Sequence, residues 1–158
     1  MTTEPALALR AMNREDLDAV VQNEQGAYDF PWSRSLIEGA FAGRDNCLVA
    51  VHDGVVVGHG IVSSVADEGH ILNVCIARRW QGHGFGRSLL MALLEFLSTA
   101  GAATVFLEVR QSNHVAANLY DSVGFNEIGV RRGYYPAPGG ITEDARILAL
   151  TLTSDWPL

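Results

Sequence analysis

The feature that most constrains this chain is a glycine-rich segment at residues 81–87, which reads QGHGFGR. It directly follows a strand-like apolar run, Ile71 to Ala77, and precedes a helical pattern of apolar residues from Ser88 to Ala100. Glycine tolerates positive φ without steric cost and lets a ligand approach the backbone closely. A glycine-rich turn that opens a helix also leaves unpaired N–H groups at the positive end of the helix dipole. The segment therefore predicts a binding site for an anion, most often a phosphate.

Periodicity and turn residues predict a single α/β (α+β) domain over residues 1–158. Asp53-Gly54 is a strong two-residue hairpin signal, and Ser33 and either Ser112 or Asn113 are suited to cap helices. The predicted order is strand, helix, helix, three antiparallel strands, helix, strand, helix, strand, strand. This order indicates a mixed, mostly antiparallel sheet of about seven strands flanked by about four helices. We expect strands at 7–12, 47–52, 55–65, 70–77, 104–110, 125–130 and 144–152, a turn at 67–69 and a loop at 133–140.

Composition and charge exclude several classes of function. The chain has 158 residues, 48% apolar and 18% charged, which is typical of a soluble globular protein with a proper core. A net charge of −7 argues against nucleic acid as a partner and is compatible with a basic peptide or an amine. No secretory signal is visible, and no apolar run approaches the ~20 residues that a membrane span requires. We therefore expect a cytoplasmic protein with no membrane partner.

The cysteines and histidines indicate neither a disulfide nor a metal site. Cys47 and Cys75 each lie in a strand-like run, where a reduced, partly buried thiol is expected. The histidines show no metal-ligand spacing, and neither H-E-x-x-H nor C-x-x-C occurs. We expect no metal.

Three phosphate compounds compete for the glycine-rich segment. A nucleotide P-loop requires a Gly-Lys pair, and here Arg87 follows the last glycine. A dinucleotide site requires G-x-G-x-x-G in a βαβ unit with an acidic residue ~20 positions on, where Glu108 does stand. The glycines instead run G-x-G-x-G, and the preceding strands form hairpins, so this alternative is disfavoured. Coenzyme A is the third candidate.

The argument for coenzyme A is a resemblance to a known family. Gln81, Gly84 and Gly86 match the pyrophosphate loop of the GNAT family of N-acetyltransferases, and the order of elements resembles that family over nearly the whole chain. The resemblance implies the GNAT fold and acetyl-CoA as cosubstrate. Segments 107–110, 113, 118–120, 123–125, 131–136 and 143–145, with the early Phe30-Pro31-Trp32-Ser33, look like the RimI branch of the family. Members of that branch acetylate the N-terminal alanine of the eighteenth small-subunit ribosomal protein.

The resemblance also implies which residues bind the cofactor. The family's loop holds the pyrophosphate with its backbone, and the strand before the loop pairs with the cofactor and polarises the thioester carbonyl. A residue matching Asn113 hydrogen-bonds the pantetheine arm, although a simple helix cap would look the same in sequence. Cys75 is disfavoured as a covalent nucleophile, because no basic partner can be assigned to it. The implied cofactor residues are Val74, Cys75, Ile76, Gly82, His83, Gly84, Phe85, Gly86, Arg87 and Asn113.

Two side chains are candidates for the chemistry of acetyl transfer. An α-ammonium has a pKa of about 7.7–8.0, so a carboxylate within one water of the amine can remove its proton. Glu108, on the strand after the loop's helix, matches the family's proposed general base; the alternative is a salt-bridged surface glutamate, for example with Arg110. Tyr120 matches the tyrosine proposed to protonate the leaving thiolate; the alternative is a tyrosine that only packs on the sheet.

The acceptor side is predicted from aromatic residues. Phe30, Pro31 and Trp32 match the family's substrate-side loop, and Tyr134 and Tyr135 lie in the predicted 133–140 loop. Glu24 and the acidic surface are suited to a basic ribosomal tail.

We therefore expect a protein N-terminal acetyltransferase that acts by direct transfer on the N-terminal segment of a basic ribosomal protein, as a monomer or weak dimer. The alternatives are acetylation of another N-terminus, a lysine side chain or a small amine, and a non-catalytic acyl-CoA-binding module.

Overall fold

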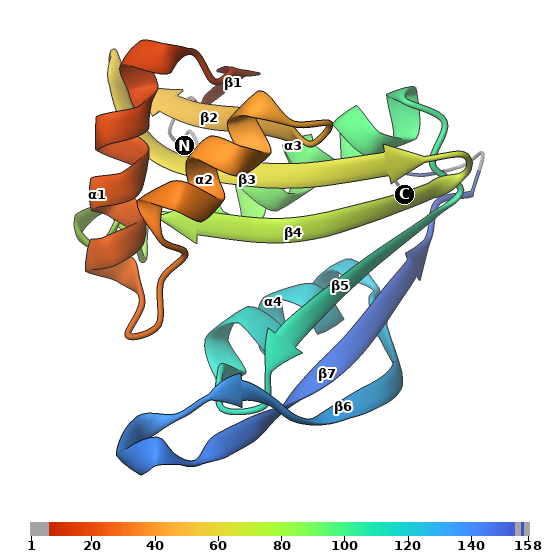
Figure 1. Cartoon of the computed structure of the whole chain (residues 1–158). Coiled ribbons are helices and arrows are strands. Elements are labelled where there is room, and N and C mark those ends of the chain that lie inside the picture. The colour runs from red at the N-terminus through yellow and green to blue at the C-terminus, as the bar shows by residue number, and fades with distance from the viewer. Residues whose placement is uncertain (1–6, 154–155, 157–158) are drawn as a thin grey trace. The chain divides into compact units, whose positions relative to one another are not determined.

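The structure, a computed structural model, describes residues 7–153 and 156 and contains one sheet with helices on its faces (Figure 1). Within these residues seven strands follow the order β1-β2-β3-β4-β5-β7-β6. The neighbours β1–β2, β2–β3, β5–β7 and β6–β7 pair antiparallel, and β4–β5 pair parallel. The elements are β1 Ala8–Ala11, α1 Leu17–Ala27, α2 Arg34–Ala42, β2 Asn46–His52, β3 Val55–Val65, β4 Glu68–Ile76, α3 Phe85–Thr99, β5 Thr104–Arg110, α4 His114–Val123, β6 Asn126–Pro136 and β7 Thr142–Thr151. The predicted order, fold class and mixed pairing are confirmed.

The described chain divides into two compact units. The first comprises residues up to 63 together with 72–96, and the second comprises 64–71 and the residues from 97 onward. The first unit thus holds β1, β2, β3 up to Ser63, the end of β4, α1, α2 and most of α3. The second holds the start of β4, β5–β7 and α4. That residues 1–158 act as a single domain stays a prediction.

In the first unit, α1 and α2 cover one face of the strands and α3 covers the other (Figure 1). The apolar positions of α1 and α2 pack with β2 and β3 into a buried cluster that includes Val20, Ile37, Val49 and Ile61. Burying side chains of this size contributes about 1.5–3 kcal/mol each, which holds the two helices on the sheet. No α-helix among the described residues has the length and apolarity to cross a membrane.

Local signals in the first unit act as the sequence predicts. Ser33 caps α2, because its side chain accepts a hydrogen bond from the N–H of Leu36 at 3.2 Å. Asp53 and Gly54 have φ of 49° and 77°, the left-handed pair that a tight hairpin between β2 and β3 requires. Asn13 is the N-cap residue of a short 3-10 turn, Arg14–Asp16, which leads into α1.

In the second unit, β5 alternates strictly between buried and half-buried positions. Val105, Leu107 and Val109 are buried, so Glu108 lies on the opposite face. Asn113 caps α4 by accepting from the N–H of Ala116 at 3.2 Å, and α4 ends at Gly124, whose φ is 116°.

Two predictions about turns are wrong. The turn before β4 lies earlier than 67–69, because Glu68 and Gly69 already pair with β5 and the left-handed residue is Ala66, with φ of 54°. The 133–140 segment is not all loop, because β6 continues to Pro136 and pairs with β7 beyond an irregularity.

That irregularity is a bulge in β6. Arg131 faces Ala145 and Tyr135 faces Glu143, so four steps along β6 match two along β7. Gly133, with φ of 60°, lies inside the bulge, and its N–H donates to Asp144 Oδ1 at 2.9 Å. A bulge bends a strand and re-aims its side chains.

Candidate active site

The glycine-rich segment forms an open turn between β4 and α3. Gly82 and Gly84 have φ of 81° and 82°, and a Cβ added to either would meet no atom within 4 Å. Glycine is therefore required at both positions for its positive φ and not for lack of space. The outer side of the turn is open to a ligand. Helix α3 begins at Phe85, so the turn lies at the positive end of a 15-residue helix. The residues present fit an anionic ligand.

Side chains of the turn brace its backbone. Gln81 Nε2 donates to the carbonyl of Ile76 at 3.0 Å. Nδ1 of His83 lies 3.2 Å and 3.1 Å from the carbonyl oxygens of Trp80 and Gln81. Since both partners are acceptors, Nδ1 carries the proton, and only Nε2 is left to contact a ligand. Phe85 is buried, and Arg87 is exposed on the first turn of α3.

The end of β4 supplies backbone groups beside this turn. The registered parallel pairs with β5 run from Glu68 to Ile71, whereas β4 continues to Ile76. The carbonyl of Val74 accepts a hydrogen bond from the Tyr28 hydroxyl. Cys75 is fully buried, and burial, followed by the nearby charge of Glu24, strongly raises the pKa of its thiol. A thiol held protonated is a poor nucleophile, which speaks against covalent catalysis by Cys75.

In the second unit, the Glu108 carboxylate forms an ion pair with the guanidinium of Arg131. Its Oε1 lies 2.8 Å from Nε of Arg131, and the side chains are 27% and 56% exposed. The same guanidinium lies 5.4 Å from the ring centroid of Tyr134. The alternative partner, Arg110, pairs instead with Glu143 at 2.9 Å and donates to the carbonyl of Pro136 at 2.6 Å. Glu108 is thus a surface-accessible carboxylate that is already occupied by a positive charge.

Burial and nearby groups raise the pKa of three tyrosine side chains. Burial raises the pKa of Tyr120 to about 12. Burial, and then the charge of Glu108, raises the pKa of Tyr135 to about 12, and Tyr120 adds to this shift. The charge of Glu108 raises the pKa of Tyr134 as well. The rings of Tyr134 and Tyr135 pack edge to face, 4.9 Å apart, and Arg110 lies 4.4 Å above Tyr135. All three phenols are therefore protonated donors at neutral pH.

The predicted acceptor loop lies in the first unit, between α1 and α2. Phe30 is 40% exposed, whereas Trp32 packs against the core cluster. Glu24 was expected to face a basic substrate tail, and this expectation is wrong. The side chain is 1% exposed and accepts from the N–H of Trp32 at 3.0 Å, because the apolar face of α1 turns it into the core.

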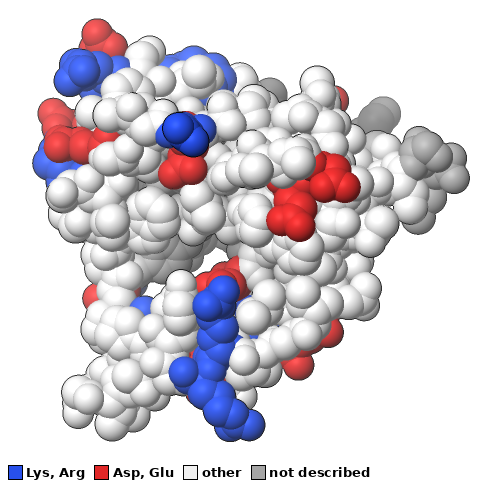
Figure 2. Space-filling view, turned by 45° about the vertical axis from the view of Figure 1, so that its right-hand side comes forward, with Lys and Arg blue, Asp and Glu red and all other residues white. Residues whose placement is uncertain are grey.

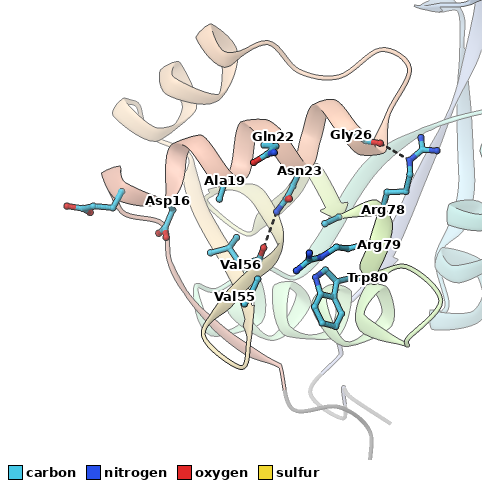
Figure 3. A pocket seen from close by; sticks show the side chains of 12 residues that line it. Asp16, Ala19, Gln22, Asn23, Gly26, Val55, Val56, Arg78, Arg79 and Trp80 are labelled. Carbon is cyan, nitrogen blue, oxygen red and sulfur yellow. Dashed lines mark hydrogen bonds between the residues drawn. The ribbon is translucent and has the colours of Figure 1, made fainter.

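A pocket of about 550 Å³ lies elsewhere in the first unit, between α1, the start of β3 and the 3-10 turn Arg78–Trp80 (Figure 3). Asn23 crosses it and donates to the carbonyl of Val56 at 3.1 Å. Arg79 lies over the Trp80 ring, 5.3 Å from its centroid. None of the predicted site residues lines this pocket, so its size alone does not mark the site.

One cluster among the described residues has the chemistry of metal ligands. Ligand atoms of Glu24, His59 and Cys75, all buried, lie within 4.8 Å of one another. Two hydrogen bonds reach Glu24 Oε1, from His59 Nε2 at 3.0 Å and from Asn73 Nδ2 at 3.1 Å, whereas His59 Nδ1 and Asn73 Oδ1 are buried without a hydrogen-bond partner in the part of the chain that the structure describes. The absence of a metal stays a prediction.

The predicted site residues thus fall into two sets. Val74–Ile76, the glycine turn and Phe30–Trp32 lie in the first unit; Glu108, Asn113, Tyr120, Tyr134 and Tyr135 lie in the second. Sequence reasoning did not assign roles to Arg131 and Tyr28, or to the buried group around Glu24. The available signal was polar residues, His59 and Asn73, at inward positions of otherwise apolar strands.

The chain is similar to proteins of known family and known structure. Residues 8–125 match the acetyltransferase (GNAT) family. The chain belongs to this family of acetyltransferases, whose acetyl donor is acetyl-CoA.

Individual relatives with a named activity are similar to most of the chain. The chain is 40% identical over 142 residues to the ribosomal protein bS18 alanine N-acetyltransferase of Salmonella typhimurium, covering 90% of this chain and 95% of that protein. It is 38% identical over 139 residues to the enzyme of the same name from Haemophilus ducreyi, covering 87% and 95%. The crystal structure of the Escherichia coli ribosomal protein S18 alanine N-acetyltransferase superposes with a TM-score of 0.87 at 36% identity, covering 97% and 99%.

Proposed function

We propose that this chain transfers the acetyl group of acetyl-CoA to the N-terminal α-amine, an alanine, of a small-subunit ribosomal protein in the cytoplasm. The observation that carries the proposal is the Glu108 carboxylate, which holds a cation beside the Tyr134 ring at an accessible position. An α-ammonium is a cation of the same charge and fits such a site. The named relatives act on the alanine of ribosomal protein bS18. In this proposal residues 1–158 act as one catalytic domain.

Glu108 acts as the general base. The acceptor arrives as an ammonium and displaces Arg131, whose exposed ion pair is weak. The carboxylate then takes one proton from the ammonium, directly or through one water, and leaves a neutral amine. The amine nitrogen forms a bond to the acetyl carbonyl carbon, and the carbon–sulfur bond breaks. As that bond breaks, the nitrogen loses a second proton, so the products are the amide, the thiolate and two protons, one on Glu108 and one that the thiolate takes up when it is protonated.

Tyr120 is the acid in this proposal. Its raised pKa keeps the hydroxyl protonated over the whole working range of pH. The same shift, about two units above the ordinary value near 10, makes complete proton transfer to a thiolate less favourable by roughly 3 kcal/mol. The hydroxyl therefore stabilises the departing sulfur first as a hydrogen-bond donor.

In this proposal the first unit binds acetyl-CoA and supplies one surface that contacts the acceptor peptide. The amides of the glycine turn suit the pyrophosphate, and the backbone of Val74–Ile76 suits the thioester carbonyl, which needs donors as charge develops on its oxygen. In the first unit, Phe30 and Trp32 provide an aromatic surface for the first residues of the acceptor, and in the second unit Tyr134 and Tyr135 provide another. The net charge of −7 favours association with a basic tail.

The test compares two synthetic peptides with the sequence of a basic tail, one with a free N-terminal alanine and one with the same N-terminus blocked. Enzyme and acetyl-CoA are supplied to both, and release of free thiol is measured. Transfer to the free peptide alone supports α-amine specificity. Equal transfer to both indicates a lysine side chain, and transfer to neither contradicts acetylation of this α-amine; either result overturns the proposal.

A further inference from the structure

A buried carboxylate lies where four segments of the first unit meet. Glu24 belongs to α1, and its Oε1 accepts from His59 of β3 at 3.0 Å and from Asn73 of β4 at 3.1 Å. Its Oε2 accepts from the backbone N–H of Trp32 at 3.0 Å. Glu24, His59 and Asn73 are 1%, 0% and 9% exposed. An ionised carboxylate is an acceptor only, and burying it is costly unless several donors surround it.

The loop before α2 is fastened at both ends to consecutive residues of β4. At its start, the Tyr28 hydroxyl donates to the carbonyl of Val74. At its end, the N–H of Trp32 binds Glu24, which also holds Asn73. Because Asn73 and Val74 are neighbours, these two links fix the loop to one short stretch of strand. That stretch adjoins the backbone assigned to the thioester.

The hydrogen-bonding groups around Glu24 are specific for a carboxylate. Three N–H groups converge on two oxygens. A glutamine has one oxygen and one NH₂ group, so it keeps all three contacts only if His59 changes tautomer and the Asn73 amide turns over, whereas a carboxylate accepts all three as they stand. Three hydrogen bonds that reach one side chain from β3, β4 and the loop suit Glu24 to fix that loop.

We propose that Glu24 is a positioning residue that fixes Phe30-Pro31-Trp32 to β4 and so sets the acceptor wall for the peptide. This inference rests on the proposed function, because that function assigns the loop to the acceptor. The carboxylate does not touch the reacting atoms in this role. It acts through the Trp32 backbone, and Tyr28 acts through Val74 in the same way.

The experiment uses Glu24→Gln in the full chain, with Asp18→Asn as the matched control. Asp18 is also an acid on α1, but its side chain is 91% exposed and its partner is Arg34, at 2.7 Å. Hydrogen exchange followed by mass spectrometry measures the amides of residues 28–33, and steady-state kinetics give KM for the acceptor and for acetyl-CoA. In Glu24→Gln we expect about tenfold faster exchange at Trp32 and about tenfold higher acceptor KM, with KM for acetyl-CoA within about twofold. Asp18→Asn should change none of these.

Tyr28→Phe removes the other link without disturbing the buried carboxylate, and serves if Glu24→Gln does not fold. It too should raise exchange in the loop and the acceptor KM. Unchanged exchange in both variants overturns the positioning role. Faster exchange with an unchanged acceptor KM shows that the loop is fixed by Glu24 but is no acceptor wall, which also overturns the inference. Wild-type enzyme that acetylates no peptide α-amine contradicts the proposed function instead, and the exchange data then report on the loop alone.

Discussion

Replacing Glu108 with glutamine separates catalysis from stability, because the structure predicts very different effects on the two. The ion pair that the variant loses is exposed, with side chains 27% and 56% accessible. Exposed pairs contribute about 0.2–1 kcal/mol. In a chain of this length, 1 kcal/mol shifts Tm by about 2–4 °C. The thermal unfolding midpoint of Glu108→Gln should therefore stay within a few degrees of wild type.

The rate of the same variant should fall steeply. A positioned general base contributes about 10²–10⁴-fold, so kcat/KM for an alanine-starting peptide should drop by that range near pH 7. Thiol release at saturating acetyl-CoA measures it. Arg131→Gln is the matched control, because it breaks the same ion pair and leaves the carboxylate in place. Its rate should change only slightly, and a non-catalytic acyl-CoA-binding module would show no effect in either variant.

The pH dependence shows whether Glu108 acts as a base. With a pKa of about 7.7–8.0, roughly 5% of an α-amine is neutral at pH 6.5 and roughly 90% at pH 9. The base is needed less as the acceptor loses its own proton, so the ratio of wild-type to Glu108→Gln rates should shrink by up to about twentyfold over this range. A ratio that stays constant with pH, or a loss below about threefold at pH 6.5, would refute the assignment of Glu108 as the base.

Four further predictions concern single residues. Tyr120→Phe should lower kcat by about 10²-fold, and wild-type kcat should show no loss from Tyr120 ionisation below about pH 10, since the pKa of this phenol is raised to about 12. Gly58→Ala should destabilise by about 1–3 kcal/mol in urea unfolding, because its Cβ would lie 2.5 Å from a backbone carbonyl of β4. Gly39→Ala, on α2 with no atom within 4 Å, should stabilise by about 0.5–1 kcal/mol. Hydrogen bonding to Arg10 lowers the pKa of Asp16, so its stabilisation is present above the ordinary value near 3.9 and is lost as pH falls through the lowered pKa. Asp16→Asn should accordingly lower the unfolding midpoint at pH 7, and the difference from wild type should narrow in acid.

The parts of the fold that sequence predicted depend on nearby residues. The left-handed pair at Asp53-Gly54, the cap at Ser33 and the turn at Gly82 and Gly84 each follow from the conformations that a few adjacent residues allow. The alternation in β5 placed Glu108 on the accessible face for the same reason. The resemblance of loop and element order then identified the family, which the comparisons confirm.

The parts that sequence did not predict depend on distant partners. Glu24 reads as a surface acid in a helix, and only donors 35 and 49 residues away, His59 and Asn73, explain its burial. The partner of Glu108 is Arg131, a residue on another strand, and not Arg110 two positions along. The glycine and proline around Tyr135 indicate a loop, but pairing with β7 keeps the segment in the sheet. In each case the tertiary contact outweighs the local preference.

Figure 2 shows both basic and acidic side chains on one face of the molecule. Exposed ion pairs such as that of Arg34 with Asp18, 2.7 Å apart, contribute little to stability. We therefore expect most single charge reversals there to be tolerated.

The bulge in β6 allows the number of residues between Arg131 and Tyr135 to vary more than a regularly paired strand would. Pairing with β7 resumes in register at Tyr135, so the two extra residues between Arg131 and Tyr135 are absorbed locally. Side chains alternate between the two faces of a strand with a period of two. Inserting or deleting two residues there therefore leaves all remaining side chains on their original faces, whereas inserting one residue would move the tyrosines to the opposite face. Under the proposed function, a change of two residues in the length of this bulge would alter the acceptor surface around Tyr134 and Tyr135 while the pairing of β6 with β7 on either side is kept.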